Sequence, residues 1–482
     1  MNELIQPREL HGKRLWGYSL GDLGLTLPNM FTGVFLFQFY VYTVNLNALL
    51  VSIGVMAQLI IGAVFAVIFG VMVDNKKPGK FGKRRPFLLL GLPIWFITTI
   101  VIWFPPYCPE SNSLYFPTAS FFWIITTIRS IFRALIYNVY VSMLPEQSQT
   151  LKNREKLAAI SSAFQILASI IALVLPLIVQ SILNDPANVK WWEPSGKLIL
   201  FFIPVIGIFC SIFGLITVIL IYISVDESFY TNNYNYFKKV RVTEAFKRMS
   251  IPLKDKNYLK LIIAGFFIGI SSKIVGLLVF PFQTYVMEFH SIQFYIYVAI
   301  SILGKFVWYF IWKKILKKTY ILKSFSVCLT FAIFGSFIDF FFLFGNLSYG
   351  ISLFLYILSW STVLGSMYAF PLFSIPIMAS LVHEAADQNI EFNLDESMSK
   401  ISGSYYGLST FVNSLGPAFA SLFVGILLSG NNEENPISII IVFVSMGGFY
   451  MLAFIFIRRI KLSKNSYYSR PTFEKQKLYL EE

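Results

Sequence analysis

Two arginines lie one helical turn apart in the middle of a long apolar stretch, residues 116–144: Arg129 and Arg133. Residues four apart share one face of a helix. Two cations this close repel each other unless an anionic group lies between them, and the guanidinium fork matches a carboxylate or a phosphate bidentately. The pair therefore predicts either a substrate-binding face or a structural ion-pair network with an acid on another helix.

Two further ionisable residues lie inside apolar stretches: Asp22 in the cytoplasmic third of residues 17–43, and Lys273 near the middle of residues 258–286. A charge at the centre of a bilayer costs about 2.5–3.5 kcal/mol on insertion scales, so each marks a candidate site. Asp22 is either a protonatable coupling group or the partner of a basic residue. We expect Lys305 to snorkel to the membrane surface and Asp339 to be interfacial or paired with a neighbour. One acid against three bases favours an anionic substrate over a neutral sugar, although sugar sites also use Arg and Lys as hydroxyl donors.

The composition shows which kind of element holds these residues. Of 482 residues, 56% are hydrophobic and 13% are charged, and the mean hydropathy is +0.66. Soluble domains average about 45–50% apolar and about 25% charged residues. The aromatic content of 18% suits lipid-facing helices and interfacial belts. The chain is therefore expected to be an all-α integral membrane protein.

Uninterrupted apolar runs of about 20 residues or more predict twelve membrane spans. They are residues 17–43, 48–73, 87–106, 116–144, 157–183, 198–224, 258–286, 291–312, 321–345, 348–382, 402–429 and 436–457.

The positive charges orient these spans. The net charge is +14, and of the 39 Lys and Arg residues 31 lie in one alternate set of connections and the termini, whereas 2 lie in the opposite set. This is the positive-inside pattern, not a nucleic-acid-binding face. It predicts a multi-pass protein of the cell membrane with both termini in the cytoplasm.

The longest connection divides the chain into halves. We expect a six-helix half at residues 1–225, a basic cytoplasmic linker at 226–257, a second six-helix half at 258–458 and a cytoplasmic tail at 459–482. The first spans of the halves are offset by about 240 residues, which indicates an internal repeat of the kind found in transporters.

Several collinear motifs carry a family resemblance. DNKKPGKFGKRRP at residues 74–86 resembles the signature loop of the glycoside–pentoside–hexuronide:cation symporters of the major facilitator superfamily. GYSLGDLG (17–24), SMLPEQSQTLKNREKL (142–157), MASLVHEAADQNIEF (378–392) and the helix that begins ISGSYYGLST (401–410) are similar to further motifs of that family, in the same order. The resemblance implies twelve membrane helices in two six-helix halves, with the first, fourth, seventh and tenth around a central cavity.

The resemblance also assigns residues. It implies that Arg129, Arg133 and Lys273 line the cavity and places the family's sugar-binding aspartate near Tyr137 or Asn138, and its helix-eleven lysine near Asn413 or Ser414. It gives a gating role to the loop residues Asp74, Lys80, Gly82, Lys83, Arg84, Arg85 and, after span four, Arg154. Glycines at 79 and 82 permit turns, the cations suit an anionic membrane surface, and Glu146 or Glu155 are candidate acidic partners. A plain topogenic charge run is the alternative.

The second span departs from the family. The family's pair of cation-binding carboxylates falls at Gly62 and Ala66, and residues 48–73 contain no acid. Sodium prefers several oxygen ligands including carboxylates. The sequence therefore predicts H⁺ as the coupling ion, with Asp22 as its binding residue, and disfavours Na⁺.

Two functions remain open on this fold. The first is symport of a glycoside, pentoside or hexuronide, and the second is carriage of an organic anion or a lysophospholipid-like amphiphile. A membrane enzyme or a sensor is a remote third, since the sequence has no Ser/His/Asp set, no HExxH, no Walker loop and no metal cluster. We expect no enzymatic activity and no cofactor or metal. The expected partners of a monomeric chain are a small-molecule substrate and membrane lipid, not nucleic acid.

Overall fold

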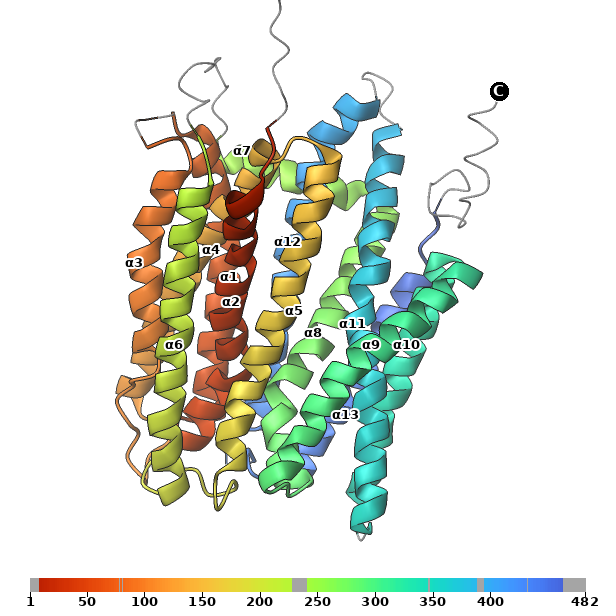
Figure 1. Ribbon diagram of the computed structural model, residues 1–482. Coiled ribbons are helices and arrows are strands. Elements are labelled where there is room, and N and C mark those ends of the chain that lie inside the picture. Colours follow the sequence, from red (N-terminus) through yellow and green to blue (C-terminus); the bar gives the residue numbers. More distant parts are fainter. Residues whose placement is uncertain are drawn as a thin grey trace, which may run out of the picture. The chain divides into compact units, whose positions relative to one another are not determined.

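The computed structural model describes residues 8–77, 79, 81–227, 241–345, 347–387, 394–430 and 432–462. These residues form helices in succession (Figure 1). Their bounds are α1 Gly12–Gln38, η1 Phe39–Thr43, α2 Ala48–Asn75, α3 Arg85–Val101, α4 Phe116–Gln147, α5 Leu151–Ser181, α6 Pro194–Ser224, α7 Val242–Met249, η3 Ile251–Lys254, α8 Lys256–Pro281, η4 Phe282–Val286, η5 Ser291–Phe294, α9 Tyr295–Lys318, α10 Ile321–Ile338, η6 Asp339–Phe344, α11 Tyr349–Asp387, α12 Leu394–Leu427 and α13 Pro436–Arg458.

The prediction of an all-α membrane protein is confirmed. In the described part of the chain, eleven helices are long and apolar enough to cross a membrane, and a shorter apolar helix, α3, corresponds to the remaining predicted span. Helix α3 ends at Val101, before the 106 predicted, because the chain turns into the Pro105–Pro106 pair. The linker prediction missed α7, a short helix with no buried residue.

The described residues divide into two compact units. The first comprises the chain up to Ala245 together with Val279–Tyr295 and Ser421–Glu434. The second comprises Phe246–Leu278, Ile296–Ala420 and the chain from Asn435 onward. The first unit thus contains the ends of α8 and α12, which are second-half helices in sequence.

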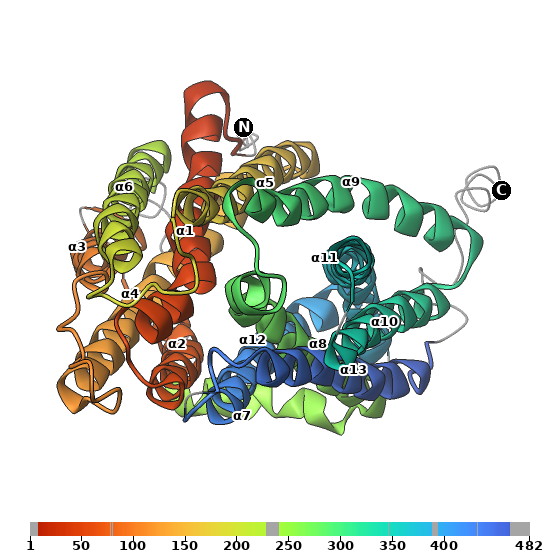
Figure 2. The same ribbon diagram turned by 90° about the horizontal axis from the view of Figure 1, so that it is seen from below.

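In the first unit, α1 packs against α5 and α6, α2 against α4, and α3 against α4 and α6 (Figure 2). Glycines allow the closest approaches. A Cβ at Gly24 of α1 would lie 1.6 Å from the Thr217 hydroxyl oxygen of α6, and one at Gly214 would lie 2.7 Å from the Trp95 ring. Small residues at helix contacts are the usual means of close packing in membranes.

In the second unit, α10 packs between α11 and α13 (Figure 2). Aromatic side chains connect these helices and α9. Trp312 of α9 stacks on Trp308 of the same helix at a centroid distance of 5.7 Å and meets Phe331 of α10 at 5.6 Å. Trp360 of α11 stacks on Phe443 of α13 at 4.8 Å. Ring pairs of this kind add stability beyond the area that they bury.

Candidate functional site

Arg129 is buried in the middle of the first unit. Its side chain is 4% exposed, and a guanidinium nitrogen donates a 2.6 Å hydrogen bond to the Thr32 hydroxyl and a 3.5 Å one to the Pro28 carbonyl of α1. Its Nε has no hydrogen-bond partner among the described residues. A buried cation with only neutral partners retains most of its capacity to bind an anion or a hydroxyl.

Arg133 and Tyr137 follow Arg129 at intervals of one turn on the same face of α4. Arg133 is half-buried and Tyr137 is 45% exposed. Within the described chain, no acidic side chain lies within 4 Å of either arginine. The face formed by Arg129, Arg133 and Tyr137, which we call the arginine face, therefore has unmet positive charge.

A different face of α4 is fastened to α2. The Trp123 indole donates to the Leu50 carbonyl at 2.8 Å, the Ser130 hydroxyl to Gln58 at 2.7 Å, and the Asn138 amide to Ala66 at 2.6 Å. These three residues recur about every two turns. The structure therefore places Asn138, predicted as a substrate-binding residue, in a helix contact and not on the arginine face.

The α2 positions that correspond to the family's carboxylate pair lie in this same contact. A Cβ at Gly62 would lie 2.3 Å from the Ser130 hydroxyl oxygen, and the Ala66 carbonyl accepts the Asn138 bond. No space for a carboxylate side chain exists at Gly62 while α2 and α4 are packed in this way.

Asp22 is held by neutral donors on two helices. The Tyr140 hydroxyl of α4 donates to one carboxylate oxygen at 2.6 Å, and the Gln165 amide of α5 donates to the other at 2.9 Å. Asp22 is 8% exposed. In the part of the chain that the structure describes, no ion pair joins Asp22 to either arginine. The Asp22–arginine network considered from sequence is therefore not formed.

Tyr18 completes the setting of Asp22. Its ring stacks on that of Tyr140 at 4.8 Å, and its hydroxyl donates to the Tyr140 carbonyl at 2.5 Å. The stacked rings of Tyr18 and Tyr140 hold in place the Tyr140 hydroxyl that donates to the Asp22 carboxylate. The geometry of that hydrogen bond therefore depends on α1 and α4 keeping their positions relative to each other.

The basic loop forms a tight turn that ends on a buried glutamate. Gly79 and Gly82 pair through two backbone hydrogen bonds, and Gly82 has φ +88°. The Glu227 carboxylate, 1% exposed, accepts the backbone N–H of Arg84 at 2.9 Å and of Arg85 at 3.2 Å. Glu227 thus caps the start of α3, where backbone donors are unsatisfied and an anion is stabilised.

The cations of this loop are anchored within the protein. Lys83 and Arg84 are 6% and 8% exposed, the Arg84 guanidinium contacts the Ser142 carbonyl, and the Arg85 guanidinium lies 4.1 Å from the Tyr222 ring centre. Lys80 and the side chains of Asp74, Glu146 and Glu155 lie outside the described residues.

Arg154 lies at the start of α5. Its Nε donates to the Ser148 carbonyl at 2.7 Å. This bond ties Arg154, which was predicted as a gate residue, to the α4–α5 turn. The Arg154 side chain is otherwise exposed.

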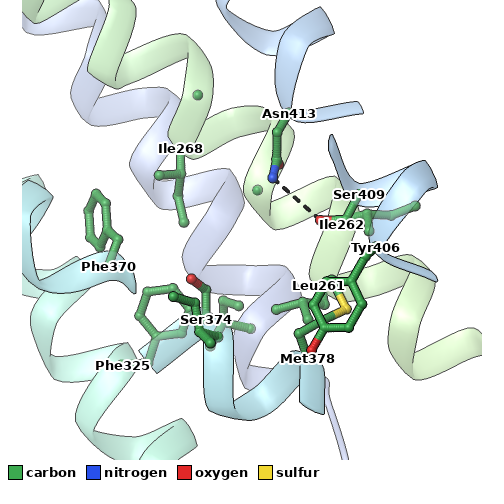
Figure 3. Close-up of a pocket in the computed structure, with 14 residues that line it drawn as sticks. Leu261, Ile262, Ile268, Phe325, Phe370, Ser374, Met378, Tyr406, Ser409 and Asn413 are labelled. Atoms are coloured by element: carbon green, nitrogen blue, oxygen red, sulfur yellow. Dashed lines mark hydrogen bonds between the residues drawn. The ribbon is translucent and has the colours of Figure 1, made fainter. Parts of the chain in front are cut away.

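In the second unit, Lys273 lies on α8 and is half-buried. It does not line the cavity of about 310 Å³ that residues of α8, α10, α11, α12 and α13 enclose in that unit. Asn413 does line it, donating to the Ser409 hydroxyl at 3.4 Å (Figure 3). Asn413 is one of the two positions at which the resemblance placed the helix-eleven lysine. The other polar lining residues are Ser374 and Tyr406, and none of the described residues in the lining is charged.

Two other ionisable residues lie inside predicted spans, Asp339 and Lys305. Asp339 is completely buried and is paired with a neighbour, as one of the two expectations had it: the Ser359 hydroxyl bonds to its carboxylate. The Lys305 side chain lies outside the described residues.

Sequence reasoning missed two buried amides, Gln38 of α1 and Gln180 of α5. They are 2% and 0% exposed, and neither amide group has a hydrogen-bond partner in the described chain. Buried polar groups are normally satisfied, so water or a substrate hydroxyl is the expected partner. An uncharged side chain inside an apolar run gave no signal in the sequence.

Comparisons with known proteins agree with this architecture. The sequence model of a family described as MFS/sugar transport protein matches residues 17–468. No curated protein sequence matches the chain.

Solved structures share the fold at low identity. The nucleoside transporter NupG is 14% identical with a TM-score of 0.60 and covers 94% of this chain and 100% of its own. A D-xylose–proton symporter is 14% identical with a TM-score of 0.62, covering 93% of this chain and 97% of its own. A bacterial homologue of the human lysosomal transporter Spinster, inward-facing and occupied, is 13% identical with a TM-score of 0.58, covering 92% of this chain and 95% of its own.

Proposed function

The chain belongs to the MFS/sugar transport protein family, and from that premise we propose that it is a secondary active transporter of a glycoside, pentoside or hexuronide, working by alternating access in symport with H⁺. The moving bodies are the two six-helix halves, residues 1–225 and 258–458. The protein acts as a monomer in the cell membrane, with the basic loop, the linker and both termini in the cytoplasm.

The arginine face carries this proposal. Arg129 has neutral partners on α1 and an unsatisfied Nε, so its guanidinium can donate to sugar hydroxyls or to the carboxylate of a hexuronide. Tyr137, exposed on the same face, supplies a ring edge and a hydroxyl of the kind that binds a sugar. We propose Lys273, half-buried on α8, as a further substrate-binding residue.

Asp22 supports H⁺ as the coupling ion. Its carboxylate accepts bonds from a tyrosine hydroxyl and an amide, and no fixed cation neutralises it among the described residues. The packed α2–α4 contact at Gly62 and Ala66 argues against a sodium site at the family's position.

One observation favours a second candidate, the carriage of an organic anion. Arg129 and Arg133 lie one turn apart with no acid within 4 Å in the described chain. A fully anionic substrate would compensate both cations, which a neutral sugar would not.

Uptake into proteoliposomes tests the function. The panel contains neutral glycosides, uronates, other organic anions and lysolipids, each with and without an inward H⁺ gradient and with and without Na⁺. We expect H⁺-driven, sodium-independent accumulation of a sugar or a hexuronide. Uptake of non-sugar anions alone would establish the second candidate, and a steep Na⁺ requirement would contradict H⁺ coupling.

Single substitutions test the proposed roles of Arg129 and Asp22. Arg129→Ala should reduce uptake by about a hundredfold, the equivalent of about 2.7 kcal/mol. The matched control is Ser130→Ala, its neighbour facing α2, which should retain uptake within about twofold. Asp22→Asn should abolish accumulation against a gradient but leave substrate exchange. Uptake by Arg129→Ala at the wild-type rate would remove the arginine face from the pathway.

A further inference from the structure

Helices α1 and α8, the first spans of the two halves, end in the same unusual way. Each passes into one π-helical turn, η1 and η4. The Val44 N–H donates to the Phe39 carbonyl at 2.9 Å, and the Met287 N–H donates to the Phe282 carbonyl at 3.0 Å. Single π-helical turns are rare in proteins overall, and those that occur are often found at functional sites.

The correspondence extends into the following residues. Leu46 N–H bonds to the Tyr40 carbonyl, and Phe289 N–H bonds to the Gln283 carbonyl, both at 2.9 Å. Between them the chain enters the left-handed region at Asn45, φ 68°, and at Glu288, φ 51°. The two helix ends therefore match residue by residue, as expected of an internal repeat.

Tyr42 and Tyr285 occupy equivalent positions in these two turns, and their rings stack at a centroid distance of 5.4 Å and an angle of 27°. The Tyr42 hydroxyl donates to the Glu433 carbonyl at 2.7 Å, in the α12–α13 loop of the second half. The Tyr285 hydroxyl donates to the Ala187 carbonyl at 3.1 Å, in the α5–α6 loop of the first half. Each tyrosine thus fastens its own half to the equivalent loop of the other.

Other contacts between the halves lie at this same end, all inside the first unit. The Lys190 ammonium lies 3.4 Å from the Glu434 carboxylate, and the Ser181 and Tyr295 hydroxyls are 3.2 Å apart. A Cβ at Gly425 of α12 would lie 2.2 Å from the hydroxyl oxygen of Ser52 on α2. This end, which we call the far end (residues 39–52, 181–193, 282–295 and 425–434), lies at the opposite ends of α1 and α2 from the basic loop.

We propose that Tyr42 and Tyr285 form a reciprocal latch that closes the far end and must release before substrate enters or leaves there. The latch rests on the proposed alternating access, which requires the halves to separate at one end at a time. Its strength suits a gate. A hydroxyl–carbonyl bond shifts an equilibrium by about fivefold, so two such bonds hold the closed state without making it permanent. Because the bonds are related by the repeat, separation of the halves breaks both together.

Cysteine accessibility tests the latch without a substrate. Gln38→Cys places a thiol one turn inward of Tyr42 on α1, and a membrane-impermeant maleimide is applied from the far side. The native Cys108, Cys210 and Cys328 are buried, and the chain without Gln38→Cys gives the background. Tyr42→Phe and Tyr285→Phe keep the rings and remove the hydroxyls. Each should raise the labelling rate about fivefold, and both together about 25-fold.

Tyr40→Phe is the matched control. Tyr40 lies in the same π-helical turn, and its hydroxyl donates to the Ile102 carbonyl at 2.6 Å, within the first half. Its labelling rate should stay within about twofold of the parent. An equal rise in Tyr40→Phe, or no rise in either latch variant, would overturn the proposal.

A second variant covers the case in which the tyrosine variants do not fold. Gly425→Val puts a side chain against Ser52 and the Ala48 carbonyl, the latter 2.9 Å from the added Cβ, and should raise labelling by about tenfold. Unchanged labelling in folded Gly425→Val would likewise contradict closure at this end. Labelling needs neither substrate nor gradient. If the uptake panel showed that the protein does not transport sugars, but labelling still rose in Tyr42→Phe and Tyr285→Phe, the latch proposal would hold.

Discussion

The two ends of the first unit are held by different sets of contacts. At the basic-loop end, residues 8–10 bond to residues 149–153, Gln147 bonds to Asp226, and Glu227 caps α3. These bonds join segments of the first half to one another and to the first residues of the linker, Asp226 and Glu227. At the far end, Tyr42, Tyr285 and Lys190 join the first half to the second. The basic-loop contacts can therefore persist while the halves move, whereas the far-end contacts cannot.

Among variants at the two ends, the largest expected effect is a loss of transport caused by a bulky side chain at the far end. Gly425→Val prevents α2 and α12 from meeting at Ser52 and should lower uptake by about tenfold or more. Gly448→Val is the control, because a Cβ at Gly448 would meet no other atom within 4 Å. Uptake per folded molecule is measured in proteoliposomes, and equal loss in both variants would contradict a closing contact at Gly425.

At the basic-loop end the largest effect should be on stability. Gly82→Ala puts a side chain at φ +88° and 2.1 Å from a Glu227 carboxylate oxygen, and should lower the free energy of unfolding by about 2–3 kcal/mol. Gly79→Ala, with nothing within 4 Å, should cost less than about 1 kcal/mol. Thermal unfolding of the purified protein measures both. Equal destabilisation would mean that the turn itself, and not the Glu227 contact, sets the cost.

A smaller loss of stability should follow removal of the Glu227 charge. Glu227→Gln keeps one acceptor for the α3 N–H groups but loses the anion, which should cost about 1 kcal/mol. Glu193→Gln is matched to it, since Glu193 is the N-cap of α6 and makes no side-chain capping bond. The same unfolding measurement should show a change of only a few tenths of a kcal/mol there. The labelling rate of the Gln38→Cys thiol should not respond to Glu227→Gln if the two ends are independent.

The smallest effect should be on the labelling rate, from a change in the α5–α6 loop, whose Ala187 carbonyl accepts the Tyr285 hydrogen bond. Asp185 accepts the N–H groups of Ala187 and Asn188 at 3.0 and 3.2 Å. Hydrogen bonding from the Asn188 side chain holds the pKa of the Asp185 carboxyl below its ordinary value. Added to the Gln38→Cys parent, Asp185→Ala should raise the rate of maleimide labelling by about two- to threefold.

The pH dependence of this contribution follows from the lowered pKa. It is complete above the ordinary aspartate pKa of about 3.9 and is lost as pH falls through the lowered value. The labelling ratio between Asp185→Ala and the parent should therefore be constant between about pH 5 and 8. A ratio that fell towards one across that range would show that another group controls the loop.

The spans and the glycine turn of the basic loop were predictable because each depends on local sequence. Apolar runs set the helices, and Gly82 follows from the turn that it makes. The partner of that turn was not predictable. Glu227 lies 143 positions from Arg84, and the sequence offered Glu146 and Glu155 as equally acidic neighbours.

The candidate site was predictable in its residues but not in its bonds. Arg129 and Asp22 stand out in apolar runs, yet their partners, Thr32 for the arginine and Tyr140 and Gln165 for the aspartate, are ordinary polar residues on other helices. The two latch tyrosines were also not predictable from the sequence, because they are ordinary residues in apolar stretches. Tyr42 and Tyr285 are two of 26 tyrosines, and only the repeated helix end distinguishes them.

Pulsed electron paramagnetic resonance distances would test the difference between the two ends most directly. One spin-label pair, Asn188→Cys with Asn432→Cys, spans the far-end loops, and a second pair, His11→Cys with Phe81→Cys, spans the basic-loop end of the first half. All four side chains are exposed. We predict that the far-end pair shows a second, longer distance whose population grows in Tyr42→Phe/Tyr285→Phe, while the basic-loop pair keeps one distance. A single, unchanging far-end distance in both proteins would contradict the account.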